Sequence, residues 1–303
     1  MHATDSSAVL PSYSGHDPQQ PQDAASSRLR PMPLMIEPGS RIGTYEVIAH
    51  LRENAAGATW LARHTGSGLE VEVRLLPVER DDLTARRLQR EVEALMAVRH
   101  PGIVRVWAFG RERGHDYIVM EHVIGMSLGY WLGQLGKLRV ADAVQVHVHL
   151  LKALSDLHRR GLVHRDVNPE AVVLSEDGRT VLRDLLMART EIGDGEGTLL
   201  DDDELTTGLY KAPEQIDGGA DARSDLYSVG VSLYHCVSGR LPFDGAGSVA
   251  VLARCESPAI PLSVSLPGVS PLLEQAVMRL LERDPDKRFS STDEAIAALS
   301  RSL

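Results

Sequence analysis

The sequence lacks the features that mark secreted, membrane-spanning and nucleic-acid-binding proteins. Its two cysteines, Cys236 and Cys255, form no C-x-x-C pair, which favours reduced core thiols in a cytoplasmic protein. The N-terminus has no basic segment leading into an apolar one, and no run of about 18 apolar residues exists, so we expect neither a secretion signal nor a membrane span. The net charge of −10 argues against DNA, RNA or anionic lipid as the main partner.

Residues 1–40 lack the periodicity of a helix or a strand. Pro, Ser, Gln and Asp dominate this stretch, and such a composition cannot bury enough apolar surface to offset the entropy of ordering the chain. We therefore predict a disordered leader. A tail that binds a partner is the alternative.

The most informative stretch lies in the middle of the chain. Residues 164–166 are His-Arg-Asp, residues 167–171 are Val-Asn-Pro-Glu-Ala, and residues 181–184 are Val-Leu-Arg-Asp. This stretch resembles the catalytic loop and the metal-binding loop of bacterial, eukaryotic-like serine/threonine protein kinases. In that family the pattern is H-R-D-x-x-x-x-N followed by D-F-G.

The resemblance implies a role for each residue of these two loops. Asp166 takes the position of the base that accepts the proton of the substrate hydroxyl, and Asp184 takes that of a ligand to Mg²⁺. Four positions depart from the family pattern. Ala171 replaces the second metal ligand, an Asn, and Asn168 replaces a Lys whose charge helps to hold the γ-phosphate. The two residues after Asp184 are leucines instead of Phe and Gly.

The segment that would hold the ATP phosphates is also altered. The family has G-x-G-x-x-G after its first strand, where bare backbone lets amide groups approach the phosphates. Residues 52–57 of this chain keep only Gly57. Arg52 and Glu53 place side chains where phosphate would lie.

The predicted third strand, residues 70–74, carries another change. Its alternation puts Glu70, Glu72 and Arg74 on one face, which the family turns toward the nucleotide. Arg74 takes the position of the family's lysine, and Glu72 replaces the small residue that covers the adenine. A carboxylate in such a dry pocket is costly unless a cation neutralises it, and Arg74 is near enough to help.

The resemblance implies further cofactor positions at Glu91, Met120, Glu121 and Val123. Glu91 lies on a helix predicted over residues 85–96 and matches the glutamate that pairs with the family's lysine, so we expect an Arg74–Glu91 pair. That pair either serves a nucleotide or only clamps the small lobe. Met120 takes the gatekeeper position, and the backbone of residues 121–123 takes that of the hinge beside the adenine.

An acidic segment separates Asp184 from an Ala-Pro-Glu motif at residues 212–214. Thr207 matches a threonine that hydrogen-bonds the base aspartate in the family, and Arg165 matches the arginine that pairs with a phosphate on this segment. In one interpretation, a carboxylate from residues 201–204 takes the place of that phosphate beside Arg165. A solvated flexible loop is the alternative.

The remaining matches anchor a large lobe. Asp225 matches an aspartate that ties down the catalytic-loop backbone, and Glu214 and Arg288 match a buried ion pair. The resemblance covers residues 44–300 and implies an α+β, bilobal fold. Its parts are a small antiparallel β lobe with one helix over about 44–120, a hinge over about 121–125, and a mostly helical lobe over about 126–300.

The sequence keeps the residues that maintain this fold and loses those that handle phosphate, which leaves two hypotheses. The first is a pseudokinase, a binding or scaffolding module for a protein partner such as another kinase or signalling protein, with weak or absent binding of ATP and Mg²⁺. The second is a divergent, active serine/threonine kinase that uses Arg74 for Lys and Asp184 as the sole metal ligand. Losing one preorganised charge stabiliser costs on the order of 10²–10³ in rate, so the sequence favours the first.

Overall fold

The computed structural model describes residues 36–54, 57–76, 82–185, 189–190, 208–215, 219–244 and 255–303. The chain divides into two units, Met1–Met32 and Pro33–Leu303, and every described residue belongs to the second. The predicted leader up to residue 35, the acidic residues 191–204 and Thr207 therefore lie outside the described residues.

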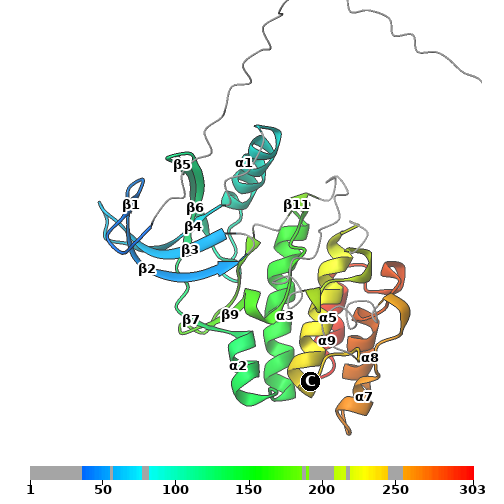
Figure 1. The fold of residues 1–303 in the computed structure, drawn as a ribbon. Coiled ribbons are helices and arrows are strands. Elements are labelled where there is room, and N and C mark those ends of the chain that lie inside the picture. Colours follow the sequence, from blue (N-terminus) through cyan, green and yellow to red (C-terminus); the bar gives the residue numbers. More distant parts are fainter. Residues whose placement is uncertain are drawn as a thin grey trace, which may run out of the picture. The chain divides into compact units, whose positions relative to one another are not determined.

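An antiparallel sheet forms the first part of this unit (Figure 1). Among the described residues its strands follow the spatial order β1-β2-β3-β4-β6-β5. Their bounds are β1 Arg41–Ile42, β2 Tyr45–Asn54, β3 Gly57–His64, β4 Glu70–Leu75, β5 Val106–Glu112 and β6 His115–Glu121. Helix α1, Asp82–Met96, follows β4 in the chain and contacts β5.

Strand β4 is buried on both of its faces. Val71 and Val73 belong to a cluster of apolar side chains within the sheet. Glu72 and Arg74 alternate with them and are nevertheless 7% and 0% exposed. Two charged side chains therefore lie in a dry environment, which requires partners of opposite charge.

Residues 36–40, which the sequence analysis assigned to the leader, belong to the folded part. Gly39 N donates to Val47 O at 2.8 Å, and Val47 N donates to Ser40 O at 2.9 Å. Ile36 packs against the apolar cluster of the sheet. The folded part therefore begins before residue 40, because these backbone groups pair with β2.

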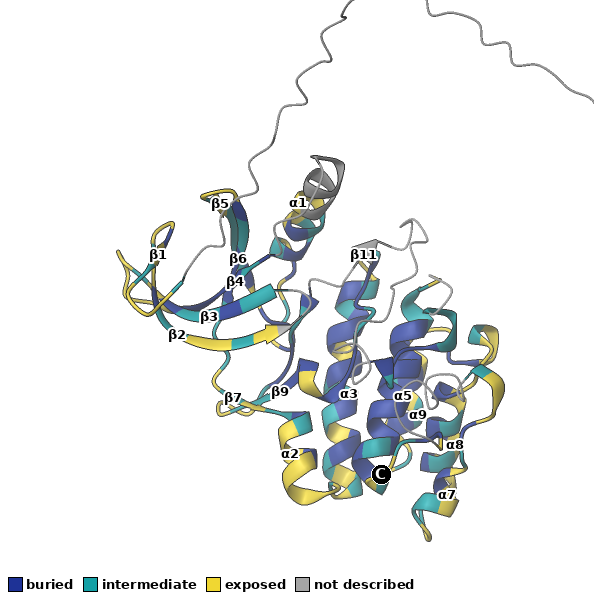
Figure 2. Ribbon diagram, viewed as in Figure 1, coloured by how far each residue is buried: buried dark blue, intermediate teal, exposed yellow. Residues whose placement is uncertain are grey.

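Helices make up most of the second part. Their bounds are α2 Leu128–Leu135, α3 Val140–His158, α5 Ala222–Ser238, α7 Leu262–Ser265, α8 Pro271–Leu280 and α9 Thr292–Ser300. Helix α3 packs against α5 and α9, and α8 packs against the same two helices. Figure 2 shows α5 buried along most of its length, because other elements surround it.

Helix α5 has a well-defined start that positions Asp225 in its first turn. Asp221 caps the helix by accepting from Arg223 N, and Ser224 completes a capping box with Asp221. The helix ends at Gly239, whose φ of +74° is left-handed. These local signals fix where Asp225 meets the loop that carries Asp166.

Short strands bring the two predicted site loops together. Strand β8, Leu162–Val163, pairs with β11, Arg189–Thr190. Strand β9, Val172–Ser175, pairs with both β10, Thr180–Leu182, and β7, Gly125–Ser127. The loop between β8 and β9 carries Asp166, and Asp184 follows β10, so this pairing places both loops next to each other.

These elements confirm the predicted α+β fold, with a small antiparallel β part and a mostly helical part. Cys236 is buried in α5, where burial raises the pKa of its thiol to about 12. Cys255 is only partly buried. None of the helices that the structure describes has the length and apolar character needed to cross a bilayer.

Candidate functional site

Helix α5 holds the loop that carries Asp166. Asp225 is fully buried and accepts from the backbone N–H groups of His164 at 2.9 Å and Arg165 at 2.8 Å. Nε2 of His158, at the end of α3, lies 2.7 Å from the same carboxylate. Burial alone would raise the pKa of Asp225, but these hydrogen bonds and the neighbouring histidines hold it below its ordinary value. The resulting carboxylate fixes the loop backbone, including the positive φ of +67° at Arg165.

Asn168 and Ala171 serve the loop and the core. Asn168 Nδ2 donates to Asp166 O at 2.9 Å, and its Oδ1 accepts from the N–H groups of Glu170 at 2.9 Å and Ala171 at 3.2 Å. Asn168 thereby caps the short 3-10 turn Pro169–Ala171. Ala171 is 1% exposed and belongs to the apolar core. Neither side chain supplies a cation for phosphate, and the methyl group of Ala171 cannot bind a metal.

Arg74 binds Asp184, the carboxylate that the resemblance assigns to the metal. Its Nε donates to Thr59 Oγ1 at 2.8 Å, and one Nη donates to Asp184 Oδ1 at 2.5 Å. Arg183 Nε lies 3.6 Å from the other carboxylate oxygen. Burial alone would raise the pKa of Asp184, but Arg74, Arg52 and Arg183 hold it below its ordinary value. Protein cations therefore neutralise this carboxylate.

Glu72 is neutralised by Arg52 and His122. Arg52 Nη2 donates to Glu72 Oε2 at 2.7 Å, and His122 Nδ1 lies 3.3 Å from Glu72 Oε1. Burial alone would raise the pKa of Glu72, but His122 and Arg52 hold it below its ordinary value, and the hydrogen bond raises the pKa of His122. The prediction that Arg74 neutralises Glu72 is wrong. Arg74 instead donates to Asp184, and the arginine that donates to Glu72 is Arg52 on β2.

The backbone geometry around residue 57 requires a glycine. Its φ is +114°, and a Cβ at this position would lie 1.9 Å from the backbone oxygen of Leu75. The close approach of β3 to β4 therefore requires a glycine here, whether or not a phosphate binds nearby. Ala55 and Ala56, the two residues before it, lie outside the described residues.

The remaining cofactor positions lie on α1 and around the end of β6. Met120 is 3% exposed. The Glu121 N–H donates to Arg105 O at 2.8 Å, and its side chain accepts from Arg179 Nη2 at 3.0 Å. Val123 is half-buried, and so is Glu91 on α1, which has interactions of its own. The Arg74–Glu91 pair stays a prediction.

The ion pair expected in the large lobe is present. Arg288 has a side chain that is 0% exposed, and its two Nη atoms donate to Glu214 Oε1 at 2.6 Å and Oε2 at 2.8 Å. Its Nε donates to Glu282 O at 2.7 Å, and its guanidinium lies 4.9 Å from the ring centroid of Tyr227. Such bidentate geometry, with the remaining donors satisfied, is what a buried pair requires.

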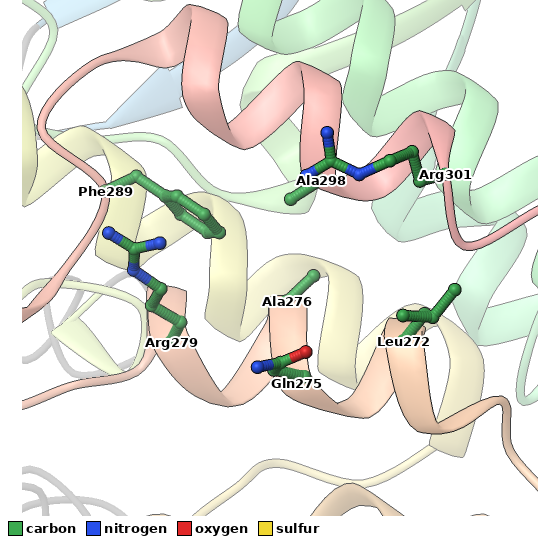
Figure 3. Close-up of a pocket in the computed structure, with 7 residues that line it drawn as sticks. All are labelled: Leu272, Gln275, Ala276, Arg279, Phe289, Ala298 and Arg301. Carbon is green, nitrogen blue, oxygen red and sulfur yellow. The ribbon is translucent and has the colours of Figure 1, made fainter.

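Hollows also occur elsewhere on the described surface. One of about 390 Å³ lies between α2 and the catalytic loop, where the Tyr210 hydroxyl is 2.8 Å from His235 Nδ1. Another of about 160 Å³ lies between α8 and α9 (Figure 3), with the guanidinium of Arg279 4.3 Å from the ring centroid of Phe289. Neither is lined by the predicted base or metal positions.

The residues around Arg74, Glu72 and Asp184, here called the cleft, differ from those that the resemblance assigns to Mg²⁺ and ATP. Arg74 binds one metal position, Asp184, and the other is the methyl group of Ala171. No group of three or more His, Cys, Asp or Glu within the described ranges is placed to hold a metal ion. The carboxylate of Glu72 occupies the position that the family leaves to a small side chain.

The sequence analysis did not identify three residues that contact the charged side chains of Glu72, Arg74 and Asp184. Thr59 is the cross-strand neighbour of both Arg52 on β2 and Arg74 on β4, but register is not visible in sequence. His122 lies in the predicted hinge, where only the backbone was considered. Arg183 directly precedes Asp184, and that adjacency was the one signal that could have identified it.

The comparisons with known proteins agree with the fold. The protein kinase domain family matches residues 45–298. A probable serine/threonine-protein kinase of Streptomyces coelicolor is 35% identical over 270 residues, which are 86% of this chain and 40% of that protein. A serine/threonine-protein kinase of Myxococcus xanthus is 35% identical over 278 residues, which are 88% of this chain and 33% of that protein.

A probable serine/threonine-protein kinase of Lactococcus lactis is 31% identical over 227 residues, which are 74% of this chain and 36% of that protein. This chain therefore spans well under half of the length of these relatives. The family match nevertheless covers most of the chain and both predicted site loops. The chain belongs to the protein kinase domain family.

Proposed function

We propose that this domain is a pseudokinase, a protein-kinase fold that transfers phosphate poorly or not at all and acts as a regulatory binding module for a protein partner. One observation carries the proposal. The guanidinium of Arg74, 1% exposed, lies 2.5 Å from the Asp184 carboxylate. A protein cation thus occupies the carboxylate that a kinase uses for Mg²⁺.

The loss of several groups together supports the proposal. Phosphoryl transfer depends almost entirely on positioning and on stabilising charge. The Lys, the second metal ligand and the loop Lys are replaced by Arg74, Ala171 and Asn168, and losing one such group typically costs on the order of 10²–10³ in rate. These groups act as a unit, so their costs do not multiply. The combined loss still places turnover far below the roughly 1–100 s⁻¹ of kinases.

Thermal unfolding of the full chain with and without millimolar MgATP tests the proposal. A ligand present at 100 times its Kd stabilises a protein by about 2.7 kcal/mol. We expect no shift that requires both Mg²⁺ and ATP. Transfer of radiolabelled γ-phosphate to the chain or to a generic protein, lost in Asp166→Asn, would overturn the proposal.

An active, divergent serine/threonine kinase is the second candidate. It is favoured by the presence of both Asp166 and Asp184, by the anchoring of the loop backbone on Asp225, and by relatives whose names are those of kinases. In this candidate Arg74 releases Asp184 when the metal arrives. Because the pair is buried, that release costs free energy that nucleotide binding has to supply.

The partner side of the proposal rests on what the fold retains. The large-lobe anchors Asp225, Glu214 and Arg288 are all engaged, so the surface of the domain is maintained although its cleft is altered. We propose a protein partner, such as another kinase or a signalling protein. Affinity capture with the purified chain tests this, with the destabilised variant Arg288→Met as the control that should lose the partner.

A further inference from the structure

Three guanidinium groups converge in the cleft. Arg52, Thr59 and Arg74 are cross-strand neighbours on three adjacent strands, so the two arginines lie about 10 Å apart at Cα. Arg183 lies beside Asp184, and the positive charge of Arg52 contributes, after burial, to lowering the pKa of Arg183. The contacts of the cleft thus unite three arginines with two carboxylates, Glu72 and Asp184.

Two donors of these arginines are buried without an acceptor. Within the described part of the chain, Nε of Arg52 and Nη1 of Arg74 have no hydrogen-bond partner. A guanidinium cannot lose its proton to avoid this situation. A buried donor without an acceptor costs about 1–3 kcal/mol, and more when it is charged, so such donors call for an explanation.

An oxyanion that reached these two donors would satisfy them and would balance the charge of the third arginine. Guanidinium groups are well suited to phosphate, because their planar donors match its oxygens in pairs. The carboxylates of the cleft do not remove this capacity. Glu72 already accepts from Arg52 Nη2, and Asp184 accepts from the other Nη of Arg74.

The same contacts disfavour a metal ion and an adenine. Because Asp184 is bound by Arg74 and the side chain of Ala171 carries no oxygen, a divalent cation has to displace Arg74 to gain even one of the two side-chain ligands that the family uses. The carboxylate of Glu72, held by Arg52 and His122, occupies the position that would cover an adenine. Arg52 and Arg183 keep 23% and 22% of their side chains exposed, whereas the side chain of Arg74 is 1% exposed.

We propose that the cleft binds a phosphate-bearing anion of the pyrophosphate class directly on Arg52, Arg74 and Arg183, without a divalent metal and without recognition of a base. This inference rests on the proposed function, since it assigns to the same cleft a ligand that a pseudokinase binds without turnover. In it, the cations of the protein take over the role that Mg²⁺ has in a kinase.

Thermal unfolding of the full chain with sodium pyrophosphate tests this inference. The titration is run in EDTA and again in excess Mg²⁺, with sodium chloride at matched ionic strength as the baseline. We expect pyrophosphate to raise the unfolding temperature in EDTA, adenosine to have no effect, and ADP to bind no more than about twofold tighter than pyrophosphate. A shift that requires Mg²⁺, or no shift beyond that of chloride, would overturn the inference.

Variants identify the residues that bind the anion. We expect Arg52→Met to weaken the apparent Kd for pyrophosphate at least tenfold. Arg63→Met is the matched control, because Arg63 lies on the same sheet but pairs with Glu70 in the exposed region. Equal weakening in both variants would contradict the assignment. Arg74→Met is a second variant, and if it fails to fold, Arg52→Met still decides.

The outcomes separate this inference from the proposed function. If no anion stabilises the chain, the inference fails and the pseudokinase proposal stands. If only MgATP stabilises it and phosphate transfer follows, both fail. If pyrophosphate binds in EDTA and no transfer occurs, both are supported.

Discussion

The pair between Arg74 and Asp184 makes a prediction that separates a structural carboxylate from a catalytic one. If Asp184 served only to bind a metal, its replacement would leave the free energy of unfolding of the metal-free protein unchanged or higher. Here Asp184 neutralises a guanidinium whose side chain is 1% exposed. We therefore expect Asp184→Ala to destabilise the protein, because it leaves a buried charge with less compensation.

The magnitude follows from the burial of the two partners. Breaking a buried ion pair from one side costs about 3–5 kcal/mol. Asp184 retains 17% exposure of its side chain, and Thr59 still accepts from Arg74 Nε, so the expected loss lies at the lower end, about 3 kcal/mol. Arg74→Met in the background of Asp184→Ala should restore much of this loss, because it removes the stranded cation.

Urea unfolding at neutral pH, in EDTA, measures each free energy, and the double-mutant cycle isolates the pair. Asp142→Ala is the control, because Asp142 pairs with Arg139 at 2.7 Å on the exposed surface, where ion pairs contribute little. An Asp184→Ala protein as stable as the parent, or more stable, would refute the structural role and favour the active-kinase hypothesis.

Three further predictions concern Glu72, Arg288 and His147. Glu72→Ala combined with Arg74→Lys should raise the affinity for nucleotide, and unchanged melting of this double variant in MgATP would count against a cleft blocked by charge. Arg288→Met should cost about 3–5 kcal/mol in urea unfolding, because it strands the Glu214 carboxylate; Arg288→Lys should recover part of it, and an equal loss in both variants would contradict a role for charge. Burial lowers the pKa of the fully buried His147 to about 4, so its contribution is complete above about pH 6.5 and declines as pH falls toward 4. His147→Gln should therefore reduce the stability difference between pH 7 and pH 5 by on the order of 2 kcal/mol, and an unchanged difference would assign the pH dependence to other groups.

Much of the fold was predictable because the sequence is locally consistent. The alternation of residues 70–74 predicted a strand with Glu72 and Arg74 on one face. The structure contains this strand as β4, and both side chains are buried there. Residues around Asp225 predicted the anchor of the loop, and the structure contains its hydrogen bonds to that backbone. The strand depends on a short spacing, which the sequence displays directly, whereas the anchor spans about 60 positions and was implied by the resemblance.

The start of the folded part and the ion-pair partners in the cleft were harder to predict from the sequence. Residues 36–40 have no strand pattern, yet they pair with β2 through backbone groups that composition does not reveal. His122 was considered only for its backbone, although its ring contacts Glu72. In both places the missing information was which other segment lies alongside.

The residues alone establish which groups are present: the family's second metal position is a methyl group at Ala171, and an arginine, Arg74, stands in place of the family's lysine. Which cation neutralises which carboxylate follows from the three-dimensional packing. Arg74 and Asp184 are 110 positions apart, and Arg52 reaches Glu72 only because β2, β3 and β4 pair in one particular register. Charge pairing acts over a few ångströms in space, and distance in space is set by strand register and packing rather than by order along the chain.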